Sequence, residues 1–261
     1  MKTELKVALI QTDLAWENPK ANRENFTSKI ASISETVDLI VLPEMFTSGF
    51  TMNASEVAET MDGETIAWLK ELSKKKEAAI VGSLVIIEKN NYYNRLVFIH
   101  PNGTIDSYDK RHTFTLAGEH KVYTAGTSKT IIDYKGFRIC PLICYDLRFP
   151  VWARNTEDYD VLLYVANWPK PRISAWDALL KARAIENMSY CIGVNRIGKD
   201  DSGHDYPGHS ACYDVLGETL SDFNSDENGI NVVTLDKSHI EAYRNKLNFL
   251  NDRDNFILQG V

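Results

Sequence analysis

A cysteine stands at the end of a long apolar run, where a thiol could act as a nucleophile. The run FRICPLI occupies residues 137–143, Cys144 follows it directly, and the more polar stretch YDLRFP begins at Tyr145. In an α/β sheet the ligand crevice lies beyond the carboxyl ends of the strands, so a thiol placed there is accessible. The turn can also present backbone N–H groups to an oxyanion. The sequence leaves two interpretations of Cys144 open, a nucleophile and a core residue, since cysteine is among the most buried residue types.

A nucleophilic thiol needs a base or a nearby cation, because a free cysteine with a pKa of about 8.5 is mostly protonated at neutral pH. Two charged residues near the ends of other runs could supply these groups. Glu44 ends VDLIVLPE, where local structure gives no reason for a carboxylate, and Lys110 follows a predicted hairpin in SYDKRHTF. A lone lysine is more typical of a solvated surface charge. The remaining cysteines lie within apolar runs and are predicted to be core: Cys140, Cys191 and Cys212.

Histidines offer an alternative base and an alternative metal site. His112 and His120 flank the lysine motif, and a Cys–His pair is a common way to activate a thiol. Nothing in the sequence pairs either histidine with Cys144. His204 and His209, in GHDYPGHS, could suggest metal binding, but carboxylate and thiolate ligands do not accompany them at useful spacing. We therefore favour the glutamate as the base and expect neither a metal nor a cofactor.

Strand-length apolar runs alternate with amphipathic stretches, which favours an α/β sheet covered by helices. The first helix would bury Phe26, Ile30 and Ile33 on one face, and Asp62 could cap the second. The predicted strands of the first half lie at 5–13, 37–44, 78–87 and 94–110, and the predicted helices at 19–35 and 62–76.

The second half of the chain repeats this order. Three of its segments resemble segments of the first half: 159–169 resembles 37–45, 189–201 resembles 78–90, and 208–222 resembles 94–109, with a helical stretch at 173–188. We infer two related half-units, each contributing a sheet with helices on one face, packed as a four-layer α-β-β-α sandwich. No low-complexity linker separates them, so we expect one domain over 1–261. A C-terminal helix and apolar arm at about 238–261 could contact a partner subunit or dock on its own domain.

Composition and charge exclude several functions. With 44% hydrophobic and 25% charged residues, the chain can bury a sizeable core. A net charge of -7 and a pI near 5.4 argue against general affinity for nucleic acid or anionic membranes. The start of the chain has no signal-peptide core, no apolar run approaches the roughly 20 residues that span a bilayer, and there is no CxxC pair. We expect a reduced, cytoplasmic protein with a small-molecule partner.

Three motifs together resemble those of the nitrilase superfamily, the carbon–nitrogen hydrolases with a Glu-Lys-Cys triad. They are LPEMF around Glu44, YDKRHTF around Lys110 and ICYDLRFP around Cys144. The resemblance extends over nearly the whole chain, and it implies the four-layer fold and a homodimer assembled through helices. It also implies that the glutamate takes the thiol proton, while the lysine and the Tyr145 N–H hold the oxyanion. Glu119, in AGEH, would support the lysine, although alone it resembles an exposed loop acid.

Within the superfamily, the stretches ICYDLRFPVW and NWPKPRISAWDALLKARAIEN are most similar to those of the omega-amidases. This similarity implies hydrolysis of the terminal amide of a small 2-oxo dicarboxylic acid monoamide through a cysteine thioester. Such an anion needs fixed donors. The candidates are Arg148, Arg172 and Arg183, with Trp168 and Phe46 as pocket walls or core. The alternatives are a nitrilase, a carbamoyl-amino-acid hydrolase or an aliphatic amidase with the same triad, and a dimeric scaffold whose triad is vestigial.

Overall fold

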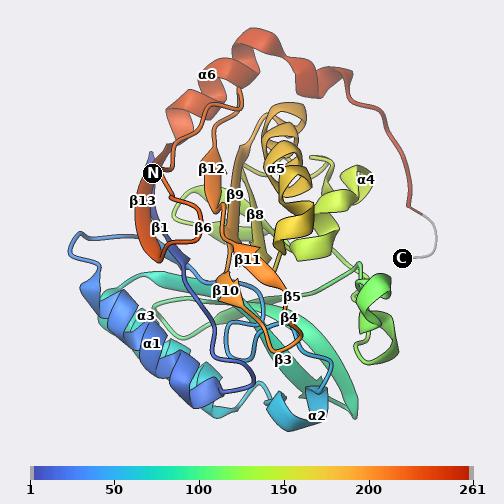
Figure 1. Ribbon diagram of the computed structural model, residues 1–261. Coiled ribbons are helices and arrows are strands. Elements are labelled where there is room, and N and C mark those ends of the chain that lie inside the picture. The colour runs from blue at the N-terminus through green and yellow to red at the C-terminus, as the bar shows by residue number, and fades with distance from the viewer. Residues whose placement is uncertain (1–2, 259–261) are drawn as a thin grey trace.

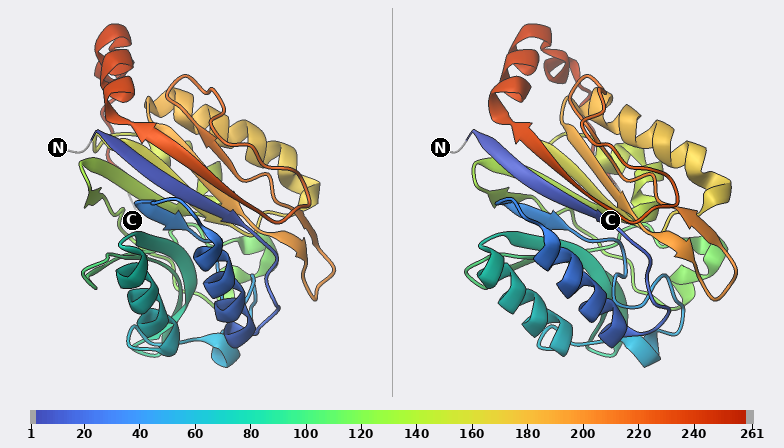
Figure 2. Two further views of the ribbon diagram at one scale, coloured as in Figure 1. Left: turned by 90° about the vertical axis from the view of Figure 1, so that its left-hand side faces the viewer. Right: turned by 60° about the vertical axis from the view of Figure 1, so that its left-hand side comes forward.

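The structure is a computed structural model that describes residues 3–258. Two mixed β-sheets pack face to face, with α1 and α3 covering the outer face of one and α5 covering the outer face of the other (Figure 1). Figure 2 shows the same four layers from two other sides, with α6 beyond one end of the sandwich. The predicted α-β-β-α architecture is confirmed.

The strands form two large sheets and one small hairpin. The first sheet has the order β13-β1-β2-β3-β4-β5, with strands at Gly229–Asp236, Glu4–Gln11, Leu39–Val41, Ala79–Glu88, Asn91–Ile99 and Ile105–Asp109. The second has the order β12-β9-β8-β7-β6, with strands at Ala211–Tyr213, Tyr190–Asn195, Val161–Ala166, Phe137–Ile143 and Ile132–Tyr134. The hairpin pairs β10 and β11, at Ile197–Lys199 and Asp205–Pro207.

The α-helices of the described chain are α1 to α6, at Pro19–Ser32, Ala54–Val57, Glu64–Lys76, Pro150–Ala153, Ile173–Asn187 and Lys237–Leu247. Short 3₁₀ helices lie at Thr115–Ala117, Glu119–Lys121, Cys144–Arg148, Lys170–Arg172 and Phe249–Asp252. None of the helices within residues 3–258 is long and apolar enough to cross a bilayer.

The two large sheets repeat one topology, as the sequence predicts. In the first sheet β1 pairs parallel with β2, β2 parallel with β3, and β3 antiparallel with β4. The second sheet has the same order and the same directions in β7, β8, β9 and β12. Each half therefore supplies the four strands of the repeat in one sheet, and β13 of the second half crosses over to pair antiparallel with β1 in the first sheet.

Both faces of each sheet are buried, which explains the nearly continuous apolar runs. On β1, Leu5, Val7 and Leu9 join the core between the two sheets, whereas Ala8 and Ile10 join the core under α1 and α3. This alternation follows from the two-residue period of a strand. A fully buried strand needs apolar residues on both faces, so apolar and polar residues do not alternate along its sequence.

Three local predictions are wrong. Asp62 does not cap α3, because Gly63 is the N-cap and the Glu59 side chain accepts the Thr65 N–H at 2.7 Å. The C-terminal stretch, predicted to be helical over 238–254, ends its helix at Leu247, since Asn248 adopts a left-handed φ of 55°. The stretch 208–222, predicted as strand, turn and strand, has the turn at Gly217 with a φ of 83°, but after β12 only a single antiparallel bridge between Tyr213 and Thr219 takes the place of the second strand.

The C-terminal arm lies against its own chain as far as residue 258. The Arg253 guanidinium donates to the Asn155 carbonyl at 3.1 Å, and Leu258 lies in a groove with Phe149 and Trp152. Ile257 is 89% exposed. The last three residues of the predicted arm lie outside the described residues.

Candidate active site

Cys144 lies at the carboxyl end of β7, on a tight turn. It is the first residue of the 3₁₀ helix Cys144–Arg148 and has a φ of 45°, in the left-handed region that non-glycine residues rarely adopt. The buried Asp146 carboxylate stabilises this turn by accepting the Ile143 N–H at 3.0 Å. The turn leaves the Cys144 side chain partly accessible, and the N–H of Tyr145, in the first turn of the helix, has no acceptor within the helix.

Lys110 connects two carboxylates at the end of β5. Its Nζ lies 2.8 Å from Glu44 Oε1 and 2.9 Å from Glu119 Oε2, and all three side chains are at most 1% exposed. Buried charges of this kind persist only when paired and hydrogen-bonded. The structure thus brings Glu44, Lys110 and Glu119 into one cluster and removes the reading of Glu119 as an exposed loop acid.

Two asparagines fix the Glu44 carboxylate. Asn94, on β4, donates to Glu44 Oε1 at 2.8 Å and to Glu119 Oε1 at 3.3 Å. Asn167, directly after β8, donates its backbone N–H to Glu44 Oε2 at 2.8 Å and its side-chain Nδ2 to the Glu44 carbonyl at 2.6 Å. Glu44 therefore cannot rotate away from the site without breaking bonds to both sheets. The predictions from sequence missed both asparagines, and only the NWP stretch of the resemblance pointed to Asn167.

The pKa shifts follow from burial and these charges. Burial alone would lower the pKa of Lys110, but the charges of Glu119 and Glu44 outweigh it and raise that pKa. Burial raises the pKa of Glu119 despite the opposing charge of Lys110. Burial, reinforced by the Glu44 carboxylate, raises the pKa of the Cys144 thiol well above its usual range. Cys144 is therefore a thiol at rest beside a fixed carboxylate, and a thiol–base pair of this kind can perform nucleophilic acyl transfer.

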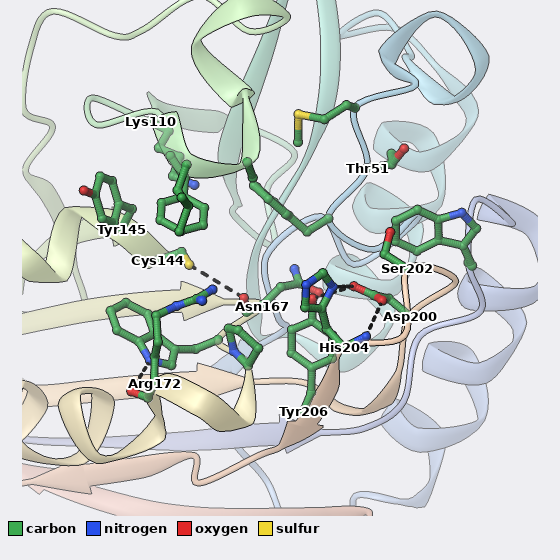
Figure 3. Close-up of a pocket in the computed structure, with 18 of the residues that line it drawn as sticks. Thr51, Lys110, Cys144, Tyr145, Asn167, Arg172, Asp200, Ser202, His204 and Tyr206 are labelled. Carbon is green, nitrogen blue, oxygen red and sulfur yellow. Dashed lines mark hydrogen bonds and ion pairs between the residues drawn. The ribbon is translucent and has the colours of Figure 1, made fainter.

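The cluster opens into a pocket of about 490 Å³ (Figure 3). Cys144, Lys110 and the Asn167 backbone lie at its inner end, where the Asn167 carbonyl oxygen is 4.0 Å from Cys144 Sγ. Two predicted arginines reach it: the Arg148 guanidinium lies 5.0 Å from the Trp168 ring centroid, and the Arg172 guanidinium lies over the Phe114 ring at 5.1 Å. Tyr145 and Trp168 form part of its wall, as does Phe50.

Two residues named for the pocket lie elsewhere. Arg183 is buried, donates to the Leu147 carbonyl at 2.7 Å and pairs with Glu186 at 2.8 Å, so it joins α5 to the turn that follows Cys144. Phe46 is completely buried under α1 and packs edge-on against Phe26. Neither side chain lines the pocket, and both belong to the core.

The histidines have separate partners. His112 stacks on Phe149, and its Nδ1 pairs with Asp146 at 2.7 Å rather than with the thiol of Cys144. His209 pairs with Asp177 at 3.0 Å, and His120 is exposed. Within residues 3–258 no group of three or more His, Cys, Asp or Glu side chains could hold a metal ion.

The predictions from sequence also did not include the residues that line the pocket opposite Cys144, which form its far wall. The hairpin β10–β11 contributes Asp200, Ser202, His204 and Tyr206 to the lining, and the loop after β1 contributes Trp16. The only signal for this wall was the histidine-rich GHDYPGHS stretch, which we considered for metal binding. The three other cysteines are fully buried, as predicted.

Comparisons with known proteins agree with this geometry. Residues 6–245 match the family model described as carbon-nitrogen hydrolase. The chain is 45% identical to the omega-amidase YafV of Yersinia enterocolitica over 97% of this chain and 98% of that protein. It is 34% identical to the 2-oxoglutaramate amidase of Bacillus subtilis over 85% of this chain and 87% of that protein.

A solved structure is also similar over the whole fold. The crystal structure of XC1258 from Xanthomonas campestris, a CN-hydrolase superfamily protein with an arsenic adduct in its active site, superposes with a TM-score of 0.96. It is 38% identical and covers 98% of this chain and 100% of that one. The chain therefore belongs to the carbon–nitrogen hydrolase family.

Proposed function

We propose that the protein hydrolyses the terminal amide of small 2-oxo dicarboxylic acid monoamides, 2-oxoglutaramate or 2-oxosuccinamate, to the 2-oxo acid and ammonia. The observation that carries the proposal is a nucleophile site that opens onto unpaired cations. Arg148 and Arg172 line the same pocket as Cys144, and within residues 3–258 neither guanidinium has a carboxylate partner. Each stacks on an aromatic ring instead, so both remain available for a substrate carboxylate.

The acylation step uses the buried cluster. Glu44 removes the proton from Cys144 as Sγ attacks the amide carbon, and the oxyanion accepts hydrogen bonds from Lys110 Nζ and the Tyr145 N–H. The Asn167 carbonyl, which accepts a hydrogen bond from the Cys144 thiol at 4.0 Å at rest, then accepts one from the amide nitrogen once the thiol has given up its proton. The C–N bond then breaks, the nitrogen takes the proton from Glu44, and ammonia leaves a thioester on Cys144.

Deacylation reverses the proton movement. Glu44 removes a proton from water, the hydroxide attacks the thioester carbon, and the same donors hold the second oxyanion. The C–S bond breaks, Sγ regains the proton from Glu44, and the 2-oxo acid leaves. The hydrogen bonds from Asn94 and Asn167 hold Glu44 in position for both transfers.

The relatives support the choice of substrate. The names omega-amidase and 2-oxoglutaramate amidase belong to proteins that match this chain over most of both lengths. Arg148 is exposed and Arg172 is partly buried, so both are hydrated without a ligand, and an anionic substrate gains a charged hydrogen bond there that a neutral aliphatic amide or a simple nitrile cannot make.

The test is ammonia release from 2-oxoglutaramate beside succinamate, glutamine, asparagine and a simple nitrile. We expect the 2-oxo amide to be turned over best and Cys144→Ala to lose roughly 10⁴-fold or more of kcat while remaining folded. Arg172→Leu is expected to raise KM by roughly 10- to 100-fold, because a charged hydrogen bond contributes about 1.5–3 kcal/mol. Turnover of another amide or of the nitrile alone would overturn the substrate, and an unaffected Cys144→Ala variant would favour a scaffold with a vestigial triad.

We further propose that the chain is a single domain that assembles as a homodimer in the cytoplasm. The single-domain proposal is supported by the core between the sheets, which contains strands from both halves. The dimer proposal is supported by an apolar surface on α5 and the turn after β12, where Ile185 is 45% and Leu216 is 38% exposed. The four free cysteines support a reducing compartment, which cell fractionation checks.

A further inference from the structure

The β10–β11 hairpin forms a rigid part of the pocket rim. Its turn is closed by the Asp200 N–H, which donates to the His204 carbonyl at 3.1 Å, and by the Gly203 N–H, which donates to the Asp200 carbonyl at 3.0 Å. At the base of the hairpin, the buried Arg196 guanidinium lies 4.7 Å from the centroid of the Tyr206 ring. The backbone of this turn is therefore held in place beside the pocket.

Asp200 holds the His204 ring in one orientation. Its Oδ1 accepts the His204 N–H at 2.9 Å, and its Oδ2 accepts the Tyr206 hydroxyl at 2.8 Å and contacts His204 Nδ1 at 3.2 Å. Burial would raise the pKa of Asp200, but the hydrogen bonds from His204 and Tyr206 outweigh it and lower that pKa. The group beside Nδ1 is thus a carboxylate that accepts Nδ1–H, and Nε2 is the ring atom left for another partner.

His204 lies at the open rim of the pocket, where 56% of its side-chain surface is exposed. It lines the pocket that holds Cys144 and Arg172, and within residues 3–258 its Nε2 makes no hydrogen bond. In Figure 3, Cys144 and Arg172 lie on one side of the pocket, whereas His204 and Asp200 lie across it. Arg172 and His204 are therefore both within the lining that a ligand in this pocket would meet, on opposite sides.

The substrate of the proposed function has three acceptor oxygens at the end remote from its amide. Two belong to a carboxylate, which suits the two-pronged donor geometry of a guanidinium. The third is the 2-oxo oxygen, which a guanidinium engaged with the carboxylate leaves free for a separate donor. In its protonated form, the His204 ring offers Nε2–H for that bond.

We propose that His204, oriented by Asp200, donates from Nε2 to the 2-oxo oxygen of the substrate and so selects 2-oxo acid amides over amides without that oxygen. This inference rests on the proposed function. It assigns His204 to specificity and leaves acyl transfer to Glu44, Lys110 and Cys144.

Two substitutions separate binding from a purely structural role. His204→Gln places an amide N–H near the position of Nε2 and loses the contact of Nδ1 with Asp200. His204→Asn places a donor near Nδ1 and loses Nε2. Lys199→Gln is the matched control, because Lys199 lies on the same hairpin, is exposed and does not line the pocket.

The measurement is kcat/KM for 2-oxoglutaramate against glutaramate, which differ only in the 2-oxo oxygen. We expect His204→Asn to reduce the preference for the 2-oxo amide about tenfold or more, with glutaramate turnover little changed, and His204→Gln to retain most of the preference. Lys199→Gln should keep the wild-type ratio. Protection of Cys144 from iodoacetamide by 2-oxoglutarate, compared with glutarate, gives the same comparison without turnover.

The outcomes distinguish this inference from the function on which it rests. A wild-type preference that persists in His204→Asn, or an equal loss on both amides, overturns the role of His204 while the amidase activity stands. A pattern in which His204→Asn behaves as wild type and His204→Gln fails shows a structural role through Asp200. A wild-type enzyme inactive on 2-oxoglutaramate overturns the proposed function and this inference with it.

Discussion

At the scale of the residue, two buried carboxylates share one ammonium group. Glu44 and Glu119 both contact Lys110. Burial is the largest influence on the pKa of the nearby Cys144 thiol and raises it; the charge of Glu44 raises this pKa further, and the charge of Lys110 lowers it. A thiolate at rest would add a second net negative charge to the buried cluster. In the mechanism that we propose, proton transfer to Glu44 during attack avoids that cost, and this transfer requires a carboxylate that is held in place.

The candidate catalytic residues could be found from the sequence, but the residues that hold them in place could not. Cys144 and Glu44 stand out because each ends or closely follows an apolar run and has no local structural reason to be there. Asn94 and Asn167 lie 50 and 123 residues from Glu44 along the chain, and an asparagine near a strand end has many ordinary explanations. The contact of Asn94 with Glu44 depends on the strand order within the first sheet, and that of Asn167 depends on how the two sheets pack.

The arginine candidates show the same limit. Arg148, Arg172 and Arg183 all lie near predicted strand ends, yet only Arg148 and Arg172 line the pocket. Arg183 is on the face of α5 that packs on the turn after Cys144, where it donates to the Leu147 carbonyl. The rotation of a helix about its axis decides between pocket and core. The buried face of α5 includes the polar residues Arg183 and Asn187, so the pattern of apolar residues alone does not fix that rotation.

At the scale of the element, Asp146 joins the turn of Cys144 to the loop of Lys110. Its Oδ1 accepts the His112 backbone N–H at 2.9 Å, and its Oδ2 accepts the Tyr108 hydroxyl at 2.9 Å and the Ile143 N–H at 3.0 Å. Tyr108 and His112 lie two residues to either side of Lys110. One buried carboxylate therefore sets the spacing between the ends of β5 and β7.

Asp146→Asn is expected to disturb that spacing. An amide would place N–H groups against donors and leave at least one buried donor unsatisfied, at a cost of about 1–3 kcal/mol for each. We predict a lower unfolding temperature and a kcat that falls more than KM rises, measured by calorimetry and steady-state kinetics. His112→Asn, which keeps a donor near Nδ1, is the milder control. Wild-type unfolding and kcat in Asp146→Asn would contradict this role.

Long elements could be predicted and short ones could not. β1, β3, β4, β7 and α5 match their sequence patterns because many residues contribute to each. β10 and β11 have three residues each, and their hairpin is specified by Asp200 hydrogen bonds and a glycine turn. No hydrophobic period exists at that length, so the far wall of the pocket was not predictable as a structure.

At the scale of the whole molecule, the duplicated topology places the site between the two halves. Glu44 follows β2 and Lys110 follows β5 in the first sheet, whereas Cys144 follows β7 in the second. Face-to-face packing brings these strand ends together. The order of the strands and the repeat were predictable from sequence similarity between the halves, but the packing distance was not.

The proposed homodimer is tested by the mass in solution. Sedimentation equilibrium should give twice the 29.6 kDa of one chain. Ile185→Glu should shift the protein toward monomer if the surface of Ile185 and Leu216 is the interface, because a buried unpaired charge is costly. Monomers of the wild-type protein across the working concentration range would contradict the dimer.

A cysteine thioester can be detected as the intact mass of the protein quenched in acid during turnover of 2-oxoglutaramate. We expect an adduct equal to the mass of the substrate less ammonia. Peptide mapping should place it on Cys144, and Cys144→Ala should show none. Turnover with no adduct on any quench time, or an adduct on Cys140, Cys191 or Cys212, would contradict the thioester mechanism and the assignment of Cys144 as the nucleophile.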